Sequence, residues 1–282
     1  MKLIADAGST KIEWVLLDNV GAIRLRTLTT GFNAATGHTD DLLTAIKAES
    51  PELYSCARDI DEIHYYGAGC AGDRCKLMEK ILNEIFPSAA CQVESDMLGA
   101  ARALCGRSEG IACILGTGSN SCHYDGEKII ANVSPLGFIL GDEGSGAVLG
   151  RRLIGMVMKG GFSDTVINRF NDRFPEATRD EIINRVYRCE RPGAYLASFV
   201  PFLREQIDNE EVAEFVTDEF RRFFRFNVLA YKRAQSLPVS FTGSVAYHFA
   251  PQLRSAAHRC GLNIRHIEKA PMDALIAYHR DR

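Results

Sequence analysis

The sequence predicts an α/β protein of two similar halves, each built from a β-β-β-α-β-α unit, with a helical insert in the second half. Three observations support this prediction. Apolar stretches with turn residues between them predict three strands at residues 2–5, 12–17 and 23–28, followed by alternating helix and strand patterns. The same order begins again at residue 111. A glycine-rich turn follows the first strand of each series, as expected for an internal duplication.

The first half is expected to span residues 1–107. After its three strands, Asp40 and Asp41 favour the start of a helix over residues 39–49. The remaining pattern predicts a strand at 63–66, a helix at 74–85, a strand at 91–94 and a helix at 96–105.

The second half is expected to span residues 108–282. Strands are predicted at 111–115, 121–124 and 128–133, followed by a helix that opens near residue 146 and ends near 159. A purely helical insert is expected over about 160–235, with breaks at Pro175 and Pro192. The sequence after the insert predicts a strand at 239–241, a helix at 245–260 and a strand at 263–267. A terminal helix from Pro271 is expected to pack back near the domain interface.

Composition excludes several classes of protein. The 282 residues include 33 basic and 36 acidic side chains, a net charge of −3, so nucleic acid and anionic membranes are not expected partners. No apolar run approaches the roughly 18 residues of a spanning helix, and Asp6 comes too early for a secretory signal. The nine cysteines show no C-x-x-C spacing, and we expect reduced, mostly buried thiols in a cytoplasmic protein.

Two turns offer backbone N–H groups with little side-chain bulk. The first is Gly8-Ser9-Thr10-Lys11 and the second is Gly116-Thr117-Gly118. Such turns suit the close approach of a polyphosphate, although most glycine-rich turns between strands are only turns. If the two halves face one another, the turns would hold one phosphate chain from opposite sides.

Two carboxylates at strand ends are candidates for chemistry. Asp6 can hold Mg²⁺ or its water shell against the phosphates, and its alternative role is to close a turn. Asp96 can accept the proton of a substrate hydroxyl as that hydroxyl attacks a γ-phosphate, although Ser95 and Asp96 are also good helix N-caps. Glu94 competes with Asp96, since strand alternation places both on one face.

Two further segments are candidates for ligand contacts. Asp142, in the flexible segment 141–145, offers only acceptors and therefore suits sugar hydroxyls, although acidic residues also favour the start of a helix. Gly243 and Ser244 lie between a strand and a helix, where backbone can approach a nucleoside; a plain turn is equally consistent. The Phe220, Phe223 and Phe224 group has helical spacing and predicts a buried helix face.

Taken together, four segments resemble the N-acetylglucosamine kinases and the related BadF-type ATPases of the actin, hexokinase and Hsp70-like superfamily. These segments are Asp6-Ala-Gly-Ser-Thr-Lys11, Leu115-Gly-Thr-Gly-Ser-Asn120, Gly141-Asp-Glu-Gly-Ser145 and Thr242-Gly-Ser-Val245. The resemblance covers essentially the whole chain. It implies two ribonuclease H-like (actin-like ATPase) domains, ATP and Mg²⁺ between them, and phosphoryl transfer to the 6-hydroxyl of an amino sugar.

The resemblance also implies roles for single residues. Asp96 would be the catalytic base and Asp6 would hold the metal ion. ATP contacts are implied for Gly8, Ser9, Thr10, Lys11, Gly116, Thr117, Gly118, Gly243 and Ser244. Sugar contacts are implied for Asn33, Ser119, Asn120, Gly137, Phe138 and Asp142. The chain departs from the family pattern at Ala7 and Ala274, where glycine is usual, and at Phe138, where the mammalian enzymes have tryptophan.

These observations predict a homodimeric, ATP-dependent amino-sugar kinase. N-acetylglucosamine is the first candidate substrate, and glucosamine, N-acetylmuramic acid and N-acetylmannosamine remain open. One alternative is an ATPase that activates a partner enzyme, for which the C-x4-C pair of Cys70 and Cys75 could serve an iron–sulfur cluster. Another alternative is a sugar-binding regulator without catalysis.

Overall fold

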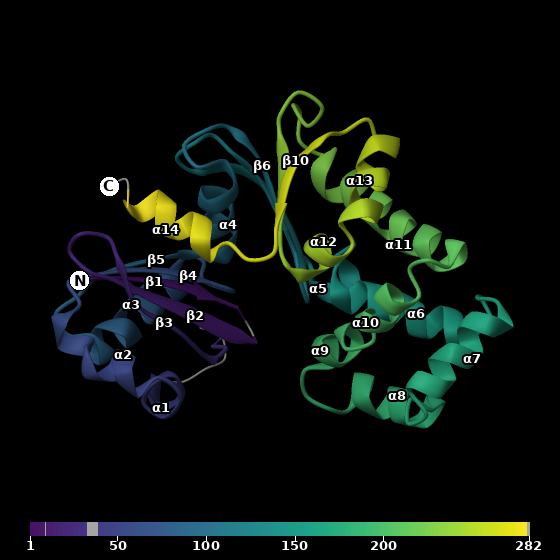
Figure 1. Cartoon of the computed structure of the whole chain (residues 1–282), viewed down its shortest axis with the longest axis horizontal. Coiled ribbons are helices and arrows are strands. Elements are labelled where there is room, and N and C mark those ends of the chain that lie inside the picture. Colours follow the sequence, from purple (N-terminus) through teal and green to yellow (C-terminus); the bar gives the residue numbers. More distant parts are fainter. Residues whose placement is uncertain (9, 33–38, 281–282) are drawn as a thin grey trace. The chain divides into compact units, whose positions relative to one another are not determined.

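The structure, a computed structural model, describes residues 1–8, 10–32 and 39–280 (Figure 1). The described strands form two mixed five-stranded sheets, with orders β3-β2-β1-β4-β5 and β10-β9-β6-β7-β8. Contacts divide the chain into two units. Unit 1 comprises the described residues of Met1–Arg107, Gly126–Lys128 and Pro271–Arg282, and unit 2 comprises Ser108–Asp125 and Ile129–Ala270.

In unit 1, β1 is the central strand, antiparallel to β2 and parallel to β4. The outer pairs are the antiparallel β2 with β3 and the parallel β4 with β5. The strands are β1 (Lys2–Ala7), β2 (Lys11–Leu17), β3 (Ile23–Thr30), β4 (Glu62–Gly67) and β5 (Ala90–Ser95). The helices between them are α1 (Thr39–Glu49), α2 (Pro51–Ser55), η1 (Ala57–Asp59), α3 (Asp73–Ile85) and α4 (Asp96–Cys105).

The sheet of unit 1 is buried on both faces of β1. Leu3 and Ala5 belong to one apolar cluster, with side chains of α1 and α3, whereas Ile4 belongs to a second cluster on the opposite face. This alternation follows from the period of two in a strand. Burial on both faces explains why β1 reads as a continuous apolar run rather than as an alternating one.

Unit 2 repeats the sheet order of unit 1, with β6 as the central strand. Strand β6 is antiparallel to β7 and parallel to β9. The strands are β6 (Gly110–Leu115), β7 (Ser119–Tyr124), β8 (Ile129–Val133), β9 (Val239–Thr242) and β10 (Ile264–Glu268). The helices outside the insert are α5 (Gly137–Leu140), α6 (Gly146–Met158), α12 (Ser244–His248) and α13 (Ala250–Arg259). The predicted fold class, two duplicated α/β units, is confirmed.

The insert between α6 and β9 is helical, as predicted. It contains α7 (Asp164–Arg173), α8 (Arg179–Tyr187), α9 (Pro192–Ala197), α10 (Val200–Glu205), α11 (Glu210–Phe223) and the π-helical η2 (Phe224–Val228). Phe220, Phe223 and Phe224 are fully buried, which confirms that these aromatic residues form a core-facing surface.

Three local details differ from the sequence-based expectation. The terminal helix α14 (Met272–Arg280), which its position in the sequence groups with the second half, packs in unit 1, where Met272, Leu275 and Ile276 share a cluster with Ile4. The helix expected over 245–260 is interrupted at Phe249, because the proline at position 251 has no N–H to continue the helical hydrogen bonds. The short α5 was not anticipated. Among the described helices, none is long and apolar enough to span a bilayer.

Candidate active site

Asp6 lies near the carboxyl end of β1, directly opposite Glu13 on β2. Alternation along β1 places Asp6 on the same face as Ile4, the face that α14 covers. Burial raises the pKa of Asp6 to about 7, and repulsion from Asp96 and then Glu13 adds to the shift, while Lys11 opposes it. The structure therefore places Asp6 and Asp96 close enough to interact.

Asp96 is the first residue of α4, directly after β5. Ser95 is the N-cap and accepts a hydrogen bond from the Leu98 N–H at 3.2 Å, so the cap does not require the Asp96 side chain. Asp96 Oδ1 accepts from the Met97 N–H at 2.8 Å. Burial raises the pKa of Asp96, and its backbone hydrogen bonds partly oppose that effect.

The small residues of α4 hold this helix close to the sheet. A Cβ atom added at Gly99 would lie 2.8 Å from Tyr66 Cγ, closer than real Cβ contacts. The alanine-rich sequence of α4 thus allows close packing on β4 and fixes the helix terminus that carries Asp96.

Glu94 and Asp96 act on different neighbours. The charge of Glu94 affects Cys75, Tyr66 and Arg102, whereas that of Asp96 affects Asp6 and Cys70. Arg102 donates to the Tyr66 hydroxyl at 2.9 Å, and both side chains lie on the Glu94 side. Strand alternation alone does not distinguish Glu94 from Asp96, but their different neighbours in the structure do.

The first glycine turn closes with a hydrogen bond from the Gly8 N–H to the Lys11 carbonyl at 2.9 Å. Thr10 and Lys11 are exposed, in a position to meet a ligand. Two predicted site residues, Ser9 and Asn33, lie outside the described residues.

The second glycine turn joins β6 to β7 and is bound to the start of α6. Gly116 and Thr117 accept hydrogen bonds through their carbonyls from the N–H groups of Gly146 and Ala147, at 2.8 and 3.0 Å. The Ser145 hydroxyl accepts from the next N–H, that of Val148, at 3.2 Å. The first N–H groups of α6 are therefore used to hold the turn, while Thr117 itself remains exposed.

Asp142 lies against the same turn. It has a left-handed backbone conformation, φ 55°, and its carboxylate accepts from the N–H groups of Ser119 and Gly137. A Cβ atom at Gly118 would be 3.1 Å from Asp142 Oδ2, so glycine leaves space for this carboxylate. The pKa of Asp142 is raised, mainly by burial and to a smaller extent by the charge of Glu143. The hydrogen bonds from the Gly137 and Ser119 N–H groups partly oppose this shift.

Phe138 is partly buried and packs against the core of unit 2 in the short helix α5. Arg151 on α6 donates to the carbonyl groups of Phe138 and, at 3.2 Å, of Ile139. This arginine positions α5 and with it the predicted sugar contacts Gly137 and Phe138.

A cavity of about 360 Å³ lies within unit 2 beside the second glycine turn. Gly116, Thr117 and Ser244 line it, together with apolar side chains of α10 and α12 such as Val200 and Val245. Its volume is within the usual range for small-molecule sites, about 300–1,000 Å³. The structure thus brings residues of two predicted ATP motifs to one cavity.

Two residues of this cavity, Arg204 and His248, were not found from the sequence. Arg204 lies 2.8 Å from His248 Nδ1, and because arginine only donates, Nδ1 is the acceptor. Burial lowers the pKa of His248, and the charges of Arg204 and Lys269 lower it further. His248 follows Ser244 by one helical turn, a spacing that could have identified it, whereas Arg204 in the insert gives no sequence signal.

Comparison with known proteins shows the family. Residues 5–246 match the model of the BadF/BadG/BcrA/BcrD ATPase family. The chain belongs to this family. A search of the curated proteins gives no match.

Among solved structures, this chain is similar to a candidate N-acetylglucosamine kinase from Porphyromonas gingivalis, at 43% identity and a TM-score of 0.94, covering 100% of this chain and 99% of that one. A second candidate N-acetylglucosamine kinase, from Chromobacterium violaceum, is 18% identical, with a TM-score of 0.72 and 98% of each chain covered. A ROK family glucokinase from Streptomyces griseus, solved with glucose and AMPPNP, is 15% identical, with a TM-score of 0.57 and 99% and 98% covered. The last two share the fold.

Proposed function

We propose that this protein is an ATP-dependent kinase that phosphorylates the 6-hydroxyl of an amino sugar, with N-acetylglucosamine as the first candidate. The observation that best supports the proposal is that the second glycine turn contacts two candidate binding features, the cavity in unit 2 and the Asp142 carboxylate. Gly116 and Thr117 line a cavity suited to a nucleoside, while the N–H of Ser119 binds the Asp142 carboxylate. A turn with these two contacts can hold a phosphate donor and a polyol acceptor in one register.

ATP is the proposed phosphate donor. The relative at 43% identity is a candidate kinase and the family is an ATPase family, which supports this choice. The nucleoside would occupy the cavity lined by Ser244 and Val245. The phosphates would then extend along the turn, where the N–H groups of Thr117 and Gly118 and the Thr117 hydroxyl can donate to them, while the Gly116 N–H closes the turn on the Gly118 carbonyl.

Asp6 is a candidate to hold a divalent cation that keeps most of its water shell, because the described part of the chain places no group of three or more His, Cys, Asp or Glu side chains as a full ligand set. Asp96 and Glu13 each repel the Asp6 carboxylate, and Lys11 is the cation that opposes this repulsion. Carboxylate oxygens with a partial water shell are the usual protein contribution to Mg²⁺ binding. Asp6 would hold the ion, which, when bound, neutralises charge on the phosphates.

Asp96 is the proposed general base. Burial raises the pKa of Asp96 above its ordinary value, which makes the carboxylate a stronger base toward a substrate hydroxyl. In the proposed step, Asp96 takes the proton of the sugar 6-hydroxyl, the sugar oxygen bonds to the γ-phosphorus, and ADP leaves with the electrons of the broken P–O bond.

The alternative function, an ATPase that activates a partner enzyme, would need Cys70 and Cys75 to bind an iron–sulfur cluster, and their surroundings do not favour this. Cys70 is buried, and burial raises the pKa of its thiol to about 12; burial also raises the pKa of Cys75. Iron–sulfur clusters need thiolates, and a cluster shared between subunits needs accessible ones.

The test is ADP release, measured by a coupled assay, across N-acetylglucosamine, glucosamine, N-acetylmuramic acid and N-acetylmannosamine. We expect activity on at least one sugar and a loss of about 10²–10⁴-fold in Asp96→Asn, the range of general-base catalysis. Glu94→Gln is the matched control and should retain most activity. Wild-type protein inactive on every sugar, or a fully active Asp96→Asn, would refute the proposal.

A further inference from the structure

We infer that Asn132 on β8 is a positioning residue that fixes the side-chain amide of Asn120, so that Asn120 meets the substrate only as a hydrogen-bond donor. The inference rests on the proposed sugar-kinase function, because Asn120 is an expected sugar contact. Asn132 belongs to none of the motifs found in the sequence.

Two backbone groups determine the orientation of both amides. The Ser121 N–H can only donate, so its partner on Asn120, at 2.9 Å, is the oxygen Oδ1. The Ser121 carbonyl can only accept, so its partner on Asn132 is the nitrogen Nδ2. The same Nδ2 also donates to Asn120 Oδ1 at 2.9 Å. The three bonds form a closed arrangement around the backbone of one residue, Ser121, whose N–H and carbonyl belong to successive peptide groups.

The strand register explains this arrangement. Asn132 is opposite Cys122 on β7, and Asn120 lies on the same face as Cys122, two residues away. The two asparagines are therefore diagonal neighbours, within reach across an antiparallel pair.

Ser121 is itself held firmly. Its buried hydroxyl donates to the Asn227 carbonyl at 2.6 Å and lies 2.8 Å from the Tyr231 hydroxyl. Tyr231 also accepts from the Val133 N–H at 3.1 Å, next to Asn132. Ser121, whose backbone orients both amides, thus has little freedom to move.

These hydrogen bonds determine which end of the Asn120 side-chain amide is left to contact a ligand. Oδ1 of Asn120 already accepts two hydrogen bonds, its usual capacity, and the NH₂ group makes none to the described part of the chain. Asp142, by contrast, offers only acceptors. The site therefore presents one fixed donor and one fixed acceptor, which suits a substrate with an accepting oxygen, such as a hydroxyl or acyl oxygen, at Asn120 and a hydroxyl donor at Asp142. An ammonium group at Asn120 would be rejected, because it cannot accept.

The test compares two changes at Asn132 that differ in polarity. Asn132→Asp keeps the shape but turns an oxygen toward the Ser121 carbonyl and Asn120 Oδ1, which favours displacement or reversal of the Asn120 amide. Asn132→Leu removes the donor without favouring reversal, since the Ser121 N–H still holds Asn120. We expect the KM for the sugar to rise on the order of tenfold in Asn132→Asp and about two- to threefold in Asn132→Leu, the scale of one hydrogen bond. The KM for ATP should stay unchanged.

A purely structural role predicts the opposite order, because aspartate matches the shape of asparagine and leucine does not. Ala131→Asp is the control for charge, since it adds a carboxylate to the exposed neighbouring position on the other face of β8. This variant should keep the wild-type KM for the sugar. Thermal unfolding of each variant checks that it is folded.

The outcomes separate the two proposals. An active wild type with an unchanged sugar KM in Asn132→Asp, or with a larger effect in Asn132→Leu, overturns the role of Asn132 and leaves the kinase proposal standing. A wild type that phosphorylates no sugar removes both. If Asn132→Asp does not fold, Asn120→Asp decides: it keeps the acceptor for Ser121 and replaces the donor, so sugar binding measured by titration should weaken at least tenfold. Unchanged binding in that variant overturns the inference.

Discussion

Asp6 lies opposite one carboxylate, Glu13, and interacts with another, Asp96. Glu13 is partly compensated by Arg26, whose Nε lies 2.7 Å from it, whereas Asp6 has no such partner at hydrogen-bond distance among the described side chains. Without a cation, an ionised Asp6 should therefore destabilise the folded chain. Strain of this kind is common where a residue serves a ligand and not the fold.

Asp6→Asn should accordingly stabilise the ligand-free protein while abolishing Mg²⁺-dependent activity. The folded-state pKa of Asp6 is raised from 3.8 to about 7, so ionisation costs the folded state most above pH 7. We expect a gain in unfolding free energy of about 2 kcal/mol at pH 8, discounted for partial exposure. As the pH falls through 7 the gain should shrink, and it should vanish below about 4. Urea unfolding at several pH values measures this.

Asp172→Asn, a change at an exposed position, is the control and should show no such pH profile. A variant at Asp6 that is less stable than wild type at pH 8 would show that Asp6 has a mainly structural role.

At the scale of elements, the strand-to-helix turn after β9 depends on Gly243. Its φ is 117°, and an added Cβ atom would lie 2.3 Å from the Leu115 carbonyl oxygen, at the start of the second glycine turn. Backbone, unlike a flexible side chain, cannot move away cheaply. The two predicted ATP motifs are thus packed against each other through one glycine.

Gly243→Ala should destabilise the protein by about 3 kcal/mol and weaken ATP binding, because the clash would move the turn at residues 116–118. Gly155→Ala in α6 is the control, since an added Cβ there meets nothing within 4 Å and alanine favours a helix. Thermal unfolding and nucleotide titration measure both effects. Equal stability of the two variants would contradict the proposed packing constraint.

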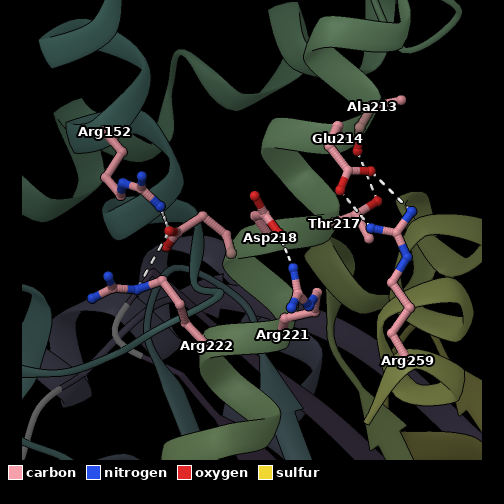
Figure 2. A network of polar contacts seen from close by, with 9 residues as sticks. Arg152, Ala213, Glu214, Thr217, Asp218, Arg221, Arg222 and Arg259 are labelled. Carbon is pink, nitrogen blue, oxygen red and sulfur yellow. Dashed lines mark hydrogen bonds and ion pairs between the residues drawn. The ribbon is translucent and has the colours of Figure 1, made fainter.

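The helices α6 and α11 are joined by an ion pair whose carboxylate is fully buried and whose arginine is partly exposed. Glu219 on α11 is fully buried and pairs with Arg152 on α6 and, at 3.5 Å, with Arg222. Figure 2 shows both arginines with dashed lines to the unlabelled carboxylate between them. The pair of Asp218 and Arg221 in the same view is half exposed. Because α6 begins at the second glycine turn, its attachment to α11 helps to fix that turn.

Arg152→Met should cost about 3 kcal/mol of unfolding free energy, because a buried carboxylate loses its main partner, whereas Arg221→Met should cost at most about 1 kcal/mol. Chemical denaturation of the two variants gives the comparison. Equal losses would show that the buried pair contributes no more than the exposed one.

Much of this organisation could be predicted from the sequence, for reasons visible in particular elements. The strand-like runs at 2–5 and 111–115 and their glycine turns identify β1, β6 and the duplication. Asp96 and Asp142 are candidates from the sequence because carboxylates beside predicted helix starts stand out, and their roles stay predictions. Arg204 and Asn132 were missed, because their roles arise from packing of the insert and from cross-strand register, neither of which leaves a local pattern. The break at Phe249 is not predicted, because the helical pattern continues on both sides of the single proline that interrupts the hydrogen bonds.

At the scale of the whole molecule, the candidate residues are divided between two units. Asp6 and Asp96 belong to unit 1, whereas the turn at 116–118, Asp142 and the cavity belong to unit 2. Phosphoryl transfer as proposed needs groups from both. Exclusion of water from the proposed site would let the sugar and not solvent receive the phosphoryl group.

The measurement that tests the central claim most directly is phosphorus NMR of reactions with ATP and N-acetylglucosamine or another amino sugar. The spectra show which product carries the γ-phosphate. The proposed function predicts ADP and a sugar 6-phosphate ester in equal amounts, with little inorganic phosphate and little ADP without sugar. Formation of ADP and inorganic phosphate at the same rate with and without every sugar would contradict it and identify an ATPase that serves another purpose.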